Sequence, residues 1–167
     1  DSGDVRQLTD SPTIDGTLQW SPDSSRILFT AMMYPDNFKA YFPTVHTVDL
    51  NGKIEDIFAN WAYNSAPYWS PDGEHIVFTG RHDDGAPIGT HSDLWVYNIK
   101  TGRSDNRTPS MELSLLGGLE GRTPTMALAN QLIAISDDGK YAFTRVQKGG
   151  TVSLYRIALS GQENWEA

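Results

Sequence analysis

The sequence holds 167 residues, of which 38% are hydrophobic, so it can bury a core of the size found in one domain or in part of a larger one. With 13 basic and 21 acidic side chains its formal charge is −8, which argues against a nucleic-acid backbone or an anionic membrane surface as the main partner. No cysteine is present, which excludes disulfides, thiolate metal sites and thiol nucleophiles. No apolar run approaches the roughly 18 residues of a membrane-spanning helix, and we expect a soluble piece of a mature or truncated protein.

Strand-like segments follow one another along the chain. A short strand is predicted over residues 5–9, followed by a WSPD turn at 20–23, a run to Thr30, a second run over 45–50 and a short strand over 54–58. Apolar residues alternate along these runs, as Ile27 and Phe29 do, and this period of two is typical of strands. No stretch shows a sustained helical period, so we expect an all-β chain.

The same order recurs twice more. WSPDGEHIVFT begins at Trp69, an offset of 49 residues from WSPDSSRILFT at Trp20, and is followed by a run over 94–99 and a short strand over 103–108. A third, weaker copy, ISDDGKYAFT from Ile135, is one residue shorter after its glycine, so that Phe143 is aligned with Phe78. A run over 154–159 follows it, and residues 109–130, which hold no copy, are predicted to be an insert.

Each copy opens on residues that suit a hairpin turn. Proline presets φ at the second turn position, the aspartate carboxylate can accept a backbone N–H two residues on, and glycine takes a positive φ. Ser24 stands in the place of that glycine in the first copy, which costs about 1 kcal/mol if its φ is positive. Trp20 and Trp69, which precede the first two turns, are expected to pack between neighbouring sheets. These structural, repeat-defining residues are Trp20, Pro22, Asp23, Trp69, Pro71, Asp72, Gly73, Asp138 and Gly139.

A period of 40 to 50 residues with about four strands is typical of a β-propeller blade. We therefore predict an all-β propeller segment of about three four-stranded blades: strand 5–9 completing a preceding blade, blades over about 14–59, 65–108 and 131–167, and the insert 109–130. The WSPDG, LWVYNIKTG and RQLT segments resemble the TolB-like (WD-like) propeller repeat, found in TolB proteins and in the N-terminal propellers of prolyl oligopeptidase-family serine peptidases. The resemblance covers nearly the whole chain outside 109–130.

Two features favour the peptidase branch of this resemblance. GGTVSLYRI, from Gly149, resembles a strand of oligopeptidase and acylaminoacyl-peptidase propellers, and inserts over 32–44 and 81–92 lengthen one connection in each of the first two blades. The resemblance implies a non-catalytic propeller that gates and orients peptides for a separate α/β-hydrolase domain, with that domain, the remaining blades and the peptide as partners. Two alternatives stay open: a TolB-like protein-binding module, and a carbohydrate-active propeller of the oligogalacturonate lyase type. The compartment, cytoplasmic or periplasmic or secreted, stays open too, and the isolated chain is expected to self-associate.

The chain carries no recognisable catalytic motif. In the peptidase family the nucleophile sits on a G-x-S-x-G elbow of the α/β-hydrolase domain. The glycine pairs four residues apart here are Gly85/Gly89 and Gly117/Gly121, with Pro87 and Leu119 at their centres. Phosphate-binding glycine loops are missing as well. We predict no catalytic residue and no cofactor site in these 167 residues, and by resemblance a serine peptidase as the parent protein.

One polar cluster in the second insert offers ligands for a divalent ion: His82, Asp83, Asp84 and His91. Oligogalacturonate lyases, which share the TolB-like propeller, bind a metal through histidines. The spacing of His82 and His91 fits no defined ligand motif, and an Asp-Asp-Gly hairpin tip is typically a solvated turn. A turn is the favoured interpretation, no metal is predicted, and a metal site is the alternative.

Two other features have both a structural and a functional interpretation. Tyr34, Phe38, Tyr41 and Phe42 form the densest aromatic cluster outside the repeat strands, and loop aromatics can anchor a partner or peptide. Packing over a neighbouring blade or an adjacent domain is the favoured interpretation. The Asn106-Arg107-Thr108 sequon lies where the repeat has an outer strand and is interpreted as structural, as is His46, in register with Trp95 and Tyr155.

Overall fold

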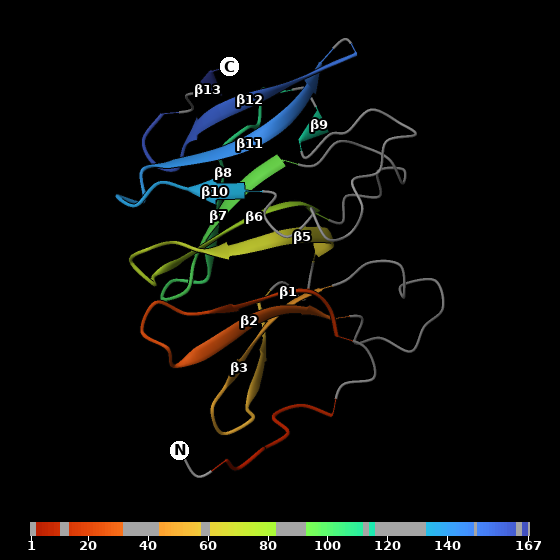
Figure 1. The fold of residues 1–167 in the computed structure, drawn as a ribbon. Coiled ribbons are helices and arrows are strands. Elements are labelled where there is room, and N and C mark those ends of the chain that lie inside the picture. Colours follow the sequence, from red (N-terminus) through yellow and green to blue (C-terminus); the bar gives the residue numbers. More distant parts are fainter. Residues whose placement is uncertain are drawn as a thin grey trace.

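The computed structural model describes residues 3–10, 14–31, 44–57, 61–82, 93–111, 114–115, 133–148, 150–162 and 165–166. Three antiparallel sheets account for most of this described part, and they follow one another in chain order (Figure 1). No helix within it has the length and hydrophobicity that crossing a membrane requires. The all-β prediction is confirmed.

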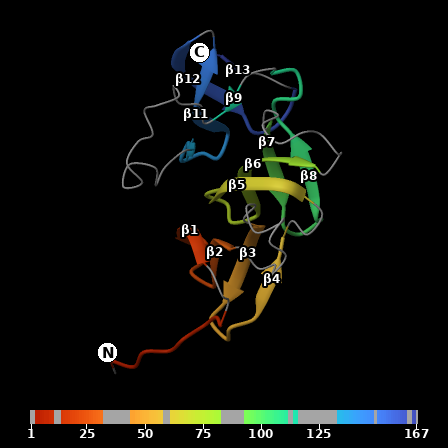
Figure 2. The ribbon, with the colours of Figure 1, turned by 90° about the vertical axis from the view of Figure 1, so that its right-hand side faces the viewer.

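Each sheet is a meander of neighbouring strands. The first contains β1 (Ile14–Trp20), β2 (Arg26–Ala31), β3 (Thr44–Asp49) and β4 (Ile54–Asp56), and the second contains β5 (Trp61–Trp69), β6 (His75–His82), β7 (Asp93–Asn98) and β8 (Arg103–Asn106). The third contains β10 (Ile133–Ile135), β11 (Tyr141–Lys148), β12 (Thr151–Ala158) and β13 (Trp165–Glu166). The short β9 (Ser114–Leu115), inside the predicted insert, pairs with β11. Figures 1 and 2 show the three sheets stacked face to face.

Side-chain alternation explains the stacking. On β2 and β6, successive residues point to opposite faces, so that Leu28 of the first sheet meets Ile76 and Phe78 of the second. On the other face of the second sheet, Val77 and Leu94 pack into a cluster with Ala142 and Ile157 of the third. All these side chains are fully buried. Apolar burial between sheets therefore holds the stack together.

The predicted turn recurs in all three copies with the same hydrogen bonds. The N–H groups of Ser21, Ser70 and Ser136 each donate to the carbonyl five residues on, at 2.8 to 2.9 Å. Each turn aspartate accepts the predicted N–H bond from two residues on: Ser25 N to Asp23, Glu74 N to Asp72 and Lys140 N to Asp138. Ser24 has φ 58°, so the expected backbone strain is present.

The predicted alignment of the third copy is wrong by one residue. Since its turn is as long as the others, Thr144, not Phe143, occupies the position of Phe78. Thr144 is 1% exposed and Phe143 only half-buried, because β11 buries alternate residues against the second sheet and turns the rest outward.

Two further expectations need correction. Residues 3–10 form no strand in the described structure: they lie against the first sheet, where Leu8 packs near Phe29 and Arg6 Nη2 donates to Asn51 O at 3.2 Å. Pairing of residues 5–9 with a preceding blade stays a prediction. Trp20 is 55% exposed, whereas Trp69 packs between the first two sheets. The two tryptophans differ because Trp20 faces the side of the first sheet away from the second.

Candidate functional site

The first strands of the three sheets, β1, β5 and β10, border one groove. It has a volume of about 390 Å³ and is lined by aromatic, proline and isoleucine side chains with two polar ones: Gln19, Trp20, Pro22, Tyr68, Trp69, Ser70, Pro71, Ile133 and Ile135. These residues come from the ends of β1, β5 and β10 and from the turns that follow β1 and β5. Four of the predicted repeat-defining residues, Trp20, Pro22, Trp69 and Pro71, lie in this lining, so the motif that builds the turns also contributes to the groove.

Hydrogen bonding fixes part of the groove wall. Gln19 Oε1 accepts a hydrogen bond from Trp69 N at 3.3 Å, which connects β1 of the first sheet to β5 of the second. The indole N–H of Trp69 is buried and has no hydrogen-bond partner within the described part of the chain. The groove wall therefore presents polar groups as well as apolar side chains, and the Trp69 indole N–H is enclosed behind it.

The turn prolines also join neighbouring sheets. A Cβ placed on Gly73 would lie 3.6 Å from Pro22 Cδ, and one on Gly139 would lie 3.8 Å from Pro71 Cδ. Each proline thus covers the glycine of the next turn, and both glycines have φ of 69°. The positive φ, which closes the hairpin, is what requires glycine, since a Cβ at these distances would only touch the proline at ordinary contact range.

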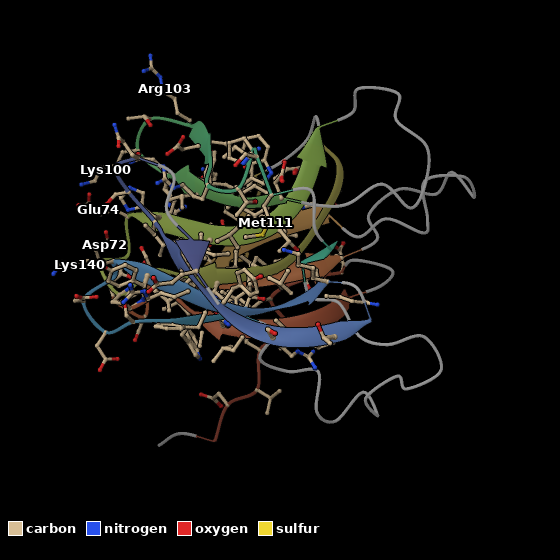
Figure 3. All side chains as sticks on the ribbon, turned by 90° about the horizontal axis from the view of Figure 1, so that it is seen from above. Asp72, Glu74, Lys100, Arg103, Met111 and Lys140 are labelled. Carbon is tan, nitrogen blue, oxygen red and sulfur yellow. The ribbon has the colours of Figure 1, made fainter. Side chains whose placement is uncertain are left out.

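Charged residues gather along this turn edge, where Figure 3 labels Asp72, Glu74, Lys100 and Lys140. Lys100 Nζ pairs with Glu74 at 2.5 Å, and Lys140 Nζ pairs with Asp138 at 3.1 Å. These pairs are largely exposed, so each contributes little to stability.

Ser70, Asp72 and His75 lie within hydrogen-bond reach of one another but do not form a catalytic triad. Ser70 Oγ donates to Asp72 Oδ1, so the serine proton is held by the carboxylate and not by the imidazole. Asn98 Oδ1 accepts from Thr101 N, which leaves Asn98 Nδ2 to donate to His75 Nε2 at 3.0 Å and His75 Nδ1–H to donate to Asp72 Oδ2. Partial burial raises the pKa of Asp72, but the hydrogen bonds from Ser70, Glu74 N and His75 lower that pKa by more. The cluster is a rigid turn.

The sequon is built into the second sheet. Asn106 Nδ2 donates to Asp93 Oδ2 at 2.9 Å, Asn106 Oδ1 accepts from Thr108 N, and Thr108 Oγ1 accepts from Leu94 N. Thr108 is fully buried. These contacts support the structural interpretation of the sequon. Asp93 takes part in them by accepting hydrogen bonds from Asn106 and Thr108.

Arg107 links the second and third sheets, a role that the sequence does not suggest. It is 4% exposed, and its guanidinium donates to Ala158 O, Gly161 O and Gln162 O at 3.0 to 3.3 Å and to Asp105 Oδ2 at 2.7 Å. In the N-terminal RQLT segment the matching residue, which also precedes a threonine, is Leu8. The presence of a charged arginine where the matching segment has a leucine is the sequence feature that could have indicated this role of Arg107.

His46 lies where expected, paired with Phe29 as Trp95 is paired with Phe78. It is 2% exposed, and its Nε2 lies 2.6 Å from Thr44 Oγ1. Burial lowers the pKa of His46, while the charge of Asp56 opposes that shift. The histidine fills a core position as a neutral ring.

The other predicted sites mostly lie outside the described residues. Asp83, Asp84 and His91, and the aromatics Tyr34, Phe38, Tyr41 and Phe42, are not among them, and His82 is described only as the last residue of β6. Within the described part, no group of three or more His, Asp or Glu side chains is placed to hold a metal ion.

No protein-family model matches the chain. A 45-residue stretch is 38% identical to Dipeptidyl-peptidase 5 of Porphyromonas gingivalis, covering 26% of this chain and 7% of that protein. TolB from Acinetobacter baumannii is similar in structure, with a TM-score of 0.63 at 20% identity over 93% of this chain and 32% of that one. A prolyl endopeptidase has a TM-score of 0.60 at 16% identity, and the match covers 92% of this chain and 21% of that one. An oligogalacturonate lyase in complex with manganese has a TM-score of 0.58 at 16% identity, and the match covers 96% of this chain and 39% of that one.

The chain thus spans less than two fifths of the length of each of these solved structures. Identities this low establish the fold alone. Together with the three sequence repeats and the three four-stranded meanders, they show that the chain has the fold of part of a β-propeller, similar in structure to TolB and to a prolyl endopeptidase.

Proposed function

We propose that the chain is the non-catalytic propeller portion of a prolyl oligopeptidase-type serine peptidase, where it gates and orients peptide substrates for a separate α/β-hydrolase domain. The observation that carries the proposal is the 45-residue stretch 38% identical to a dipeptidyl-peptidase. Fold likeness to a prolyl endopeptidase and to a puromycin-hydrolyzing peptidase from Mycobacterium tuberculosis, with TM-scores of 0.60 and 0.61, supports it.

The chemistry of the described residues fits a division of labour between two domains. The turn serines Ser21, Ser70 and Ser136 donate hydrogen bonds to aspartates. The pKa of each of these carboxylates is lowered, which makes it a poor base for activating a serine. The nucleophile and its histidine would then come from the hydrolase domain. In this proposal the tightly stacked sheets of the propeller exclude folded proteins. An extended peptide passes along the groove bordered by β1, β5 and β10.

A TolB-like protein-binding module is the second candidate. The groove favours it, because Tyr68 and Trp69 with Pro22 and Pro71 offer aromatic and proline surface beside polar groups, a combination that suits an extended peptide segment. The carbohydrate-active alternative is supported by fold likeness to the oligogalacturonate lyase alone.

Labelling with a fluorophosphonate, which reacts with activated serines, tests the first candidate. We expect the full polypeptide produced from the natural gene to be labelled at one serine outside these 167 residues, and the 167-residue chain to stay unlabelled and to hydrolyse no peptide. Labelling of any serine within the 167 residues would contradict the proposed division of labour. An unlabelled full polypeptide would contradict the peptidase role and favour the binding module.

A further inference from the structure

His46 occupies a position that holds a different aromatic residue in each of the other two sheets. His46 on β3, Trp95 on β7 and Tyr155 on β12 pair with residues that lie at the same distance from the turn serine of their sheets. Rings of different chemistry thus fill the same place, and the indole and phenol rings do so without taking up a proton. The histidine adds a group that titrates close to neutral pH.

The ring of His46 is enclosed on the side of the first sheet that faces away from the second. It is 2% exposed and lies against Phe29, with the ring centroids 5.5 Å apart. Phe29 forms an apolar cluster with Ala31, Val48 and Leu8, which we call the outer cluster. Because Leu8 belongs to residues 3–10, the outer cluster holds that segment against the end of the stack (Figure 1).

Hydrogen bonds place the proton of the neutral ring. Thr44 Oγ1 donates to Ala31 O at 3.3 Å, so it accepts from His46 Nε2–H at 2.6 Å. The other ring nitrogen, Nδ1, is buried and has no hydrogen-bond partner within the described part of the chain. A neutral ring therefore leaves one lone pair without a donor. A protonated ring would leave a charged N–H without an acceptor, which is more unfavourable.

The charged groups around the ring compensate only in part. Asp56 of β4 lies opposite His46 in the register, and its charge favours the protonated ring. The residues of β2 beside the ring are uncharged, and segment 3–10 carries Asp4, Arg6 and Asp10, all of them exposed. Burial outweighs the charge of Asp56 and lowers the pKa of His46 from 6.5.

We propose that His46 is an acid-sensitive switch: when its buried ring takes up a proton, the first sheet loosens at the outer cluster and holds residues 3–10 less firmly. The other two sheets, with Trp95 and Tyr155 at this position, lack the switch. The inference rests on the packing of the first sheet and not on the peptidase role, so either can fail alone.

The switch responds to acid in one direction. The closed sheet binds a proton at His46 less readily than the open sheet, so the closed state holds fewer protons below pH 6.5. Its stability is therefore complete above pH 6.5 and falls as the pH is lowered from that value. A return to neutral pH restores the closed sheet.

Thiol labelling measures the opening, because these 167 residues contain no cysteine. Val48→Cys places a thiol in the outer cluster, and Leu94→Cys places one between the second and third sheets; both residues are buried. The variants are made in the full polypeptide of the natural gene, and modification is measured by peptide mass. The native labelling rate is divided by the rate in denaturant at the same pH, which cancels the ionisation of the thiol itself.

We expect the normalised labelling of Val48→Cys to rise about tenfold or more between about pH 7.5 and about pH 5, and that of Leu94→Cys to stay constant. His46→Phe keeps a ring at this position and His46→Gln keeps a polar group. Neither titrates in this range, so the rise should disappear in both. His75→Phe, at a partly exposed turn histidine, is the matched control and should keep the rise.

Three results would overturn the proposal. The first is labelling of Val48→Cys that does not change with pH, and the second is a rise that persists when His46 is replaced by phenylalanine or glutamine. The third is an equal rise at Val48→Cys and Leu94→Cys, which would show that acid unfolds all three sheets together rather than loosening the first.

Discussion

Hydrogen bonds to Asp138 show how a single residue stabilises a repeat turn. Its carboxylate accepts from Ser136 Oγ at 2.7 Å and from Lys140 N at 3.1 Å, and these bonds lower the pKa of Asp138 from 3.8 to about 2. Bonds of the same kind from Ser21 and Ser25 lower the pKa of Asp23. The ionised carboxylate is the form that the turn requires.

Acid should therefore weaken the turns within a defined pH range. Because the folded pKa of Asp138 lies below its unfolded value, the native state holds fewer protons between pH 3.8 and about 2. The contribution is complete above pH 3.8 and is lost as the pH falls towards 2. Thermal unfolding from about pH 2 to about pH 5 should show a weaker pH dependence in Asp138→Asn than in the unmodified chain. Asp137→Asn, at an exposed neighbouring carboxylate, is the control, and an equal effect of both variants would contradict this assignment.

At the scale of elements, Arg107 is the clearest link between sheets. Arg107 directly follows β8 of the second sheet and donates to three backbone carbonyls of the third. Because Arg107 is buried, water cannot readily replace these hydrogen bonds. Hydrogen bonds to a buried charged group contribute about 1.5 to 3 kcal/mol. We expect Arg107→Ala to lower the free energy of unfolding by about 2 to 4 kcal/mol, measured by urea denaturation.

Arg107→Leu is the informative comparison, because Leu8 occupies the matching repeat position in the N-terminal segment. Leucine restores apolar packing without a buried charge, so its cost should be smaller than that of alanine. Equal losses in the two variants would show that the carbonyl contacts alone stabilise the junction, and no loss in either would contradict the link.

The strands and turns were predictable from the sequence because they depend on local chemistry. Serine, proline, aspartate and glycine at fixed spacing specify the hairpin, and alternation specifies β2, β6 and β11. What local chemistry could not reveal was which sheet each face would meet. Neighbouring sheets in the stack decide that Trp20 is exposed, that Phe143 faces outward and that Arg107 contacts the third sheet. Strand β13 has only two residues, which is too short for a sequence pattern to predict it.

At the scale of the whole molecule, the stack has two unequal ends. Residues 3–10 lie over part of the first sheet, although Trp20 stays 55% exposed, and at the other end of the stack Leu154 and Val152 of the third sheet are exposed. Some hundreds of Å² of exposed apolar surface at roughly 25 cal/mol/Å² amount to several kcal/mol, which is comparable with the stability of a small domain. A segment of a propeller therefore lacks stabilisation that further sheets would supply.

Sedimentation velocity of the purified 167-residue chain at micromolar concentration, combined with equilibrium unfolding of the same sample, tests this account most directly. If the chain is an open segment of a propeller, it should self-associate, with a mean sedimentation coefficient that rises with concentration, or unfold without a cooperative transition. Leu154→Lys should reduce the association, because it places a charge on the exposed apolar side of the third sheet. A compact monomer that melts cooperatively and keeps the same sedimentation coefficient at every concentration would show that the three sheets are complete by themselves, and would contradict the account.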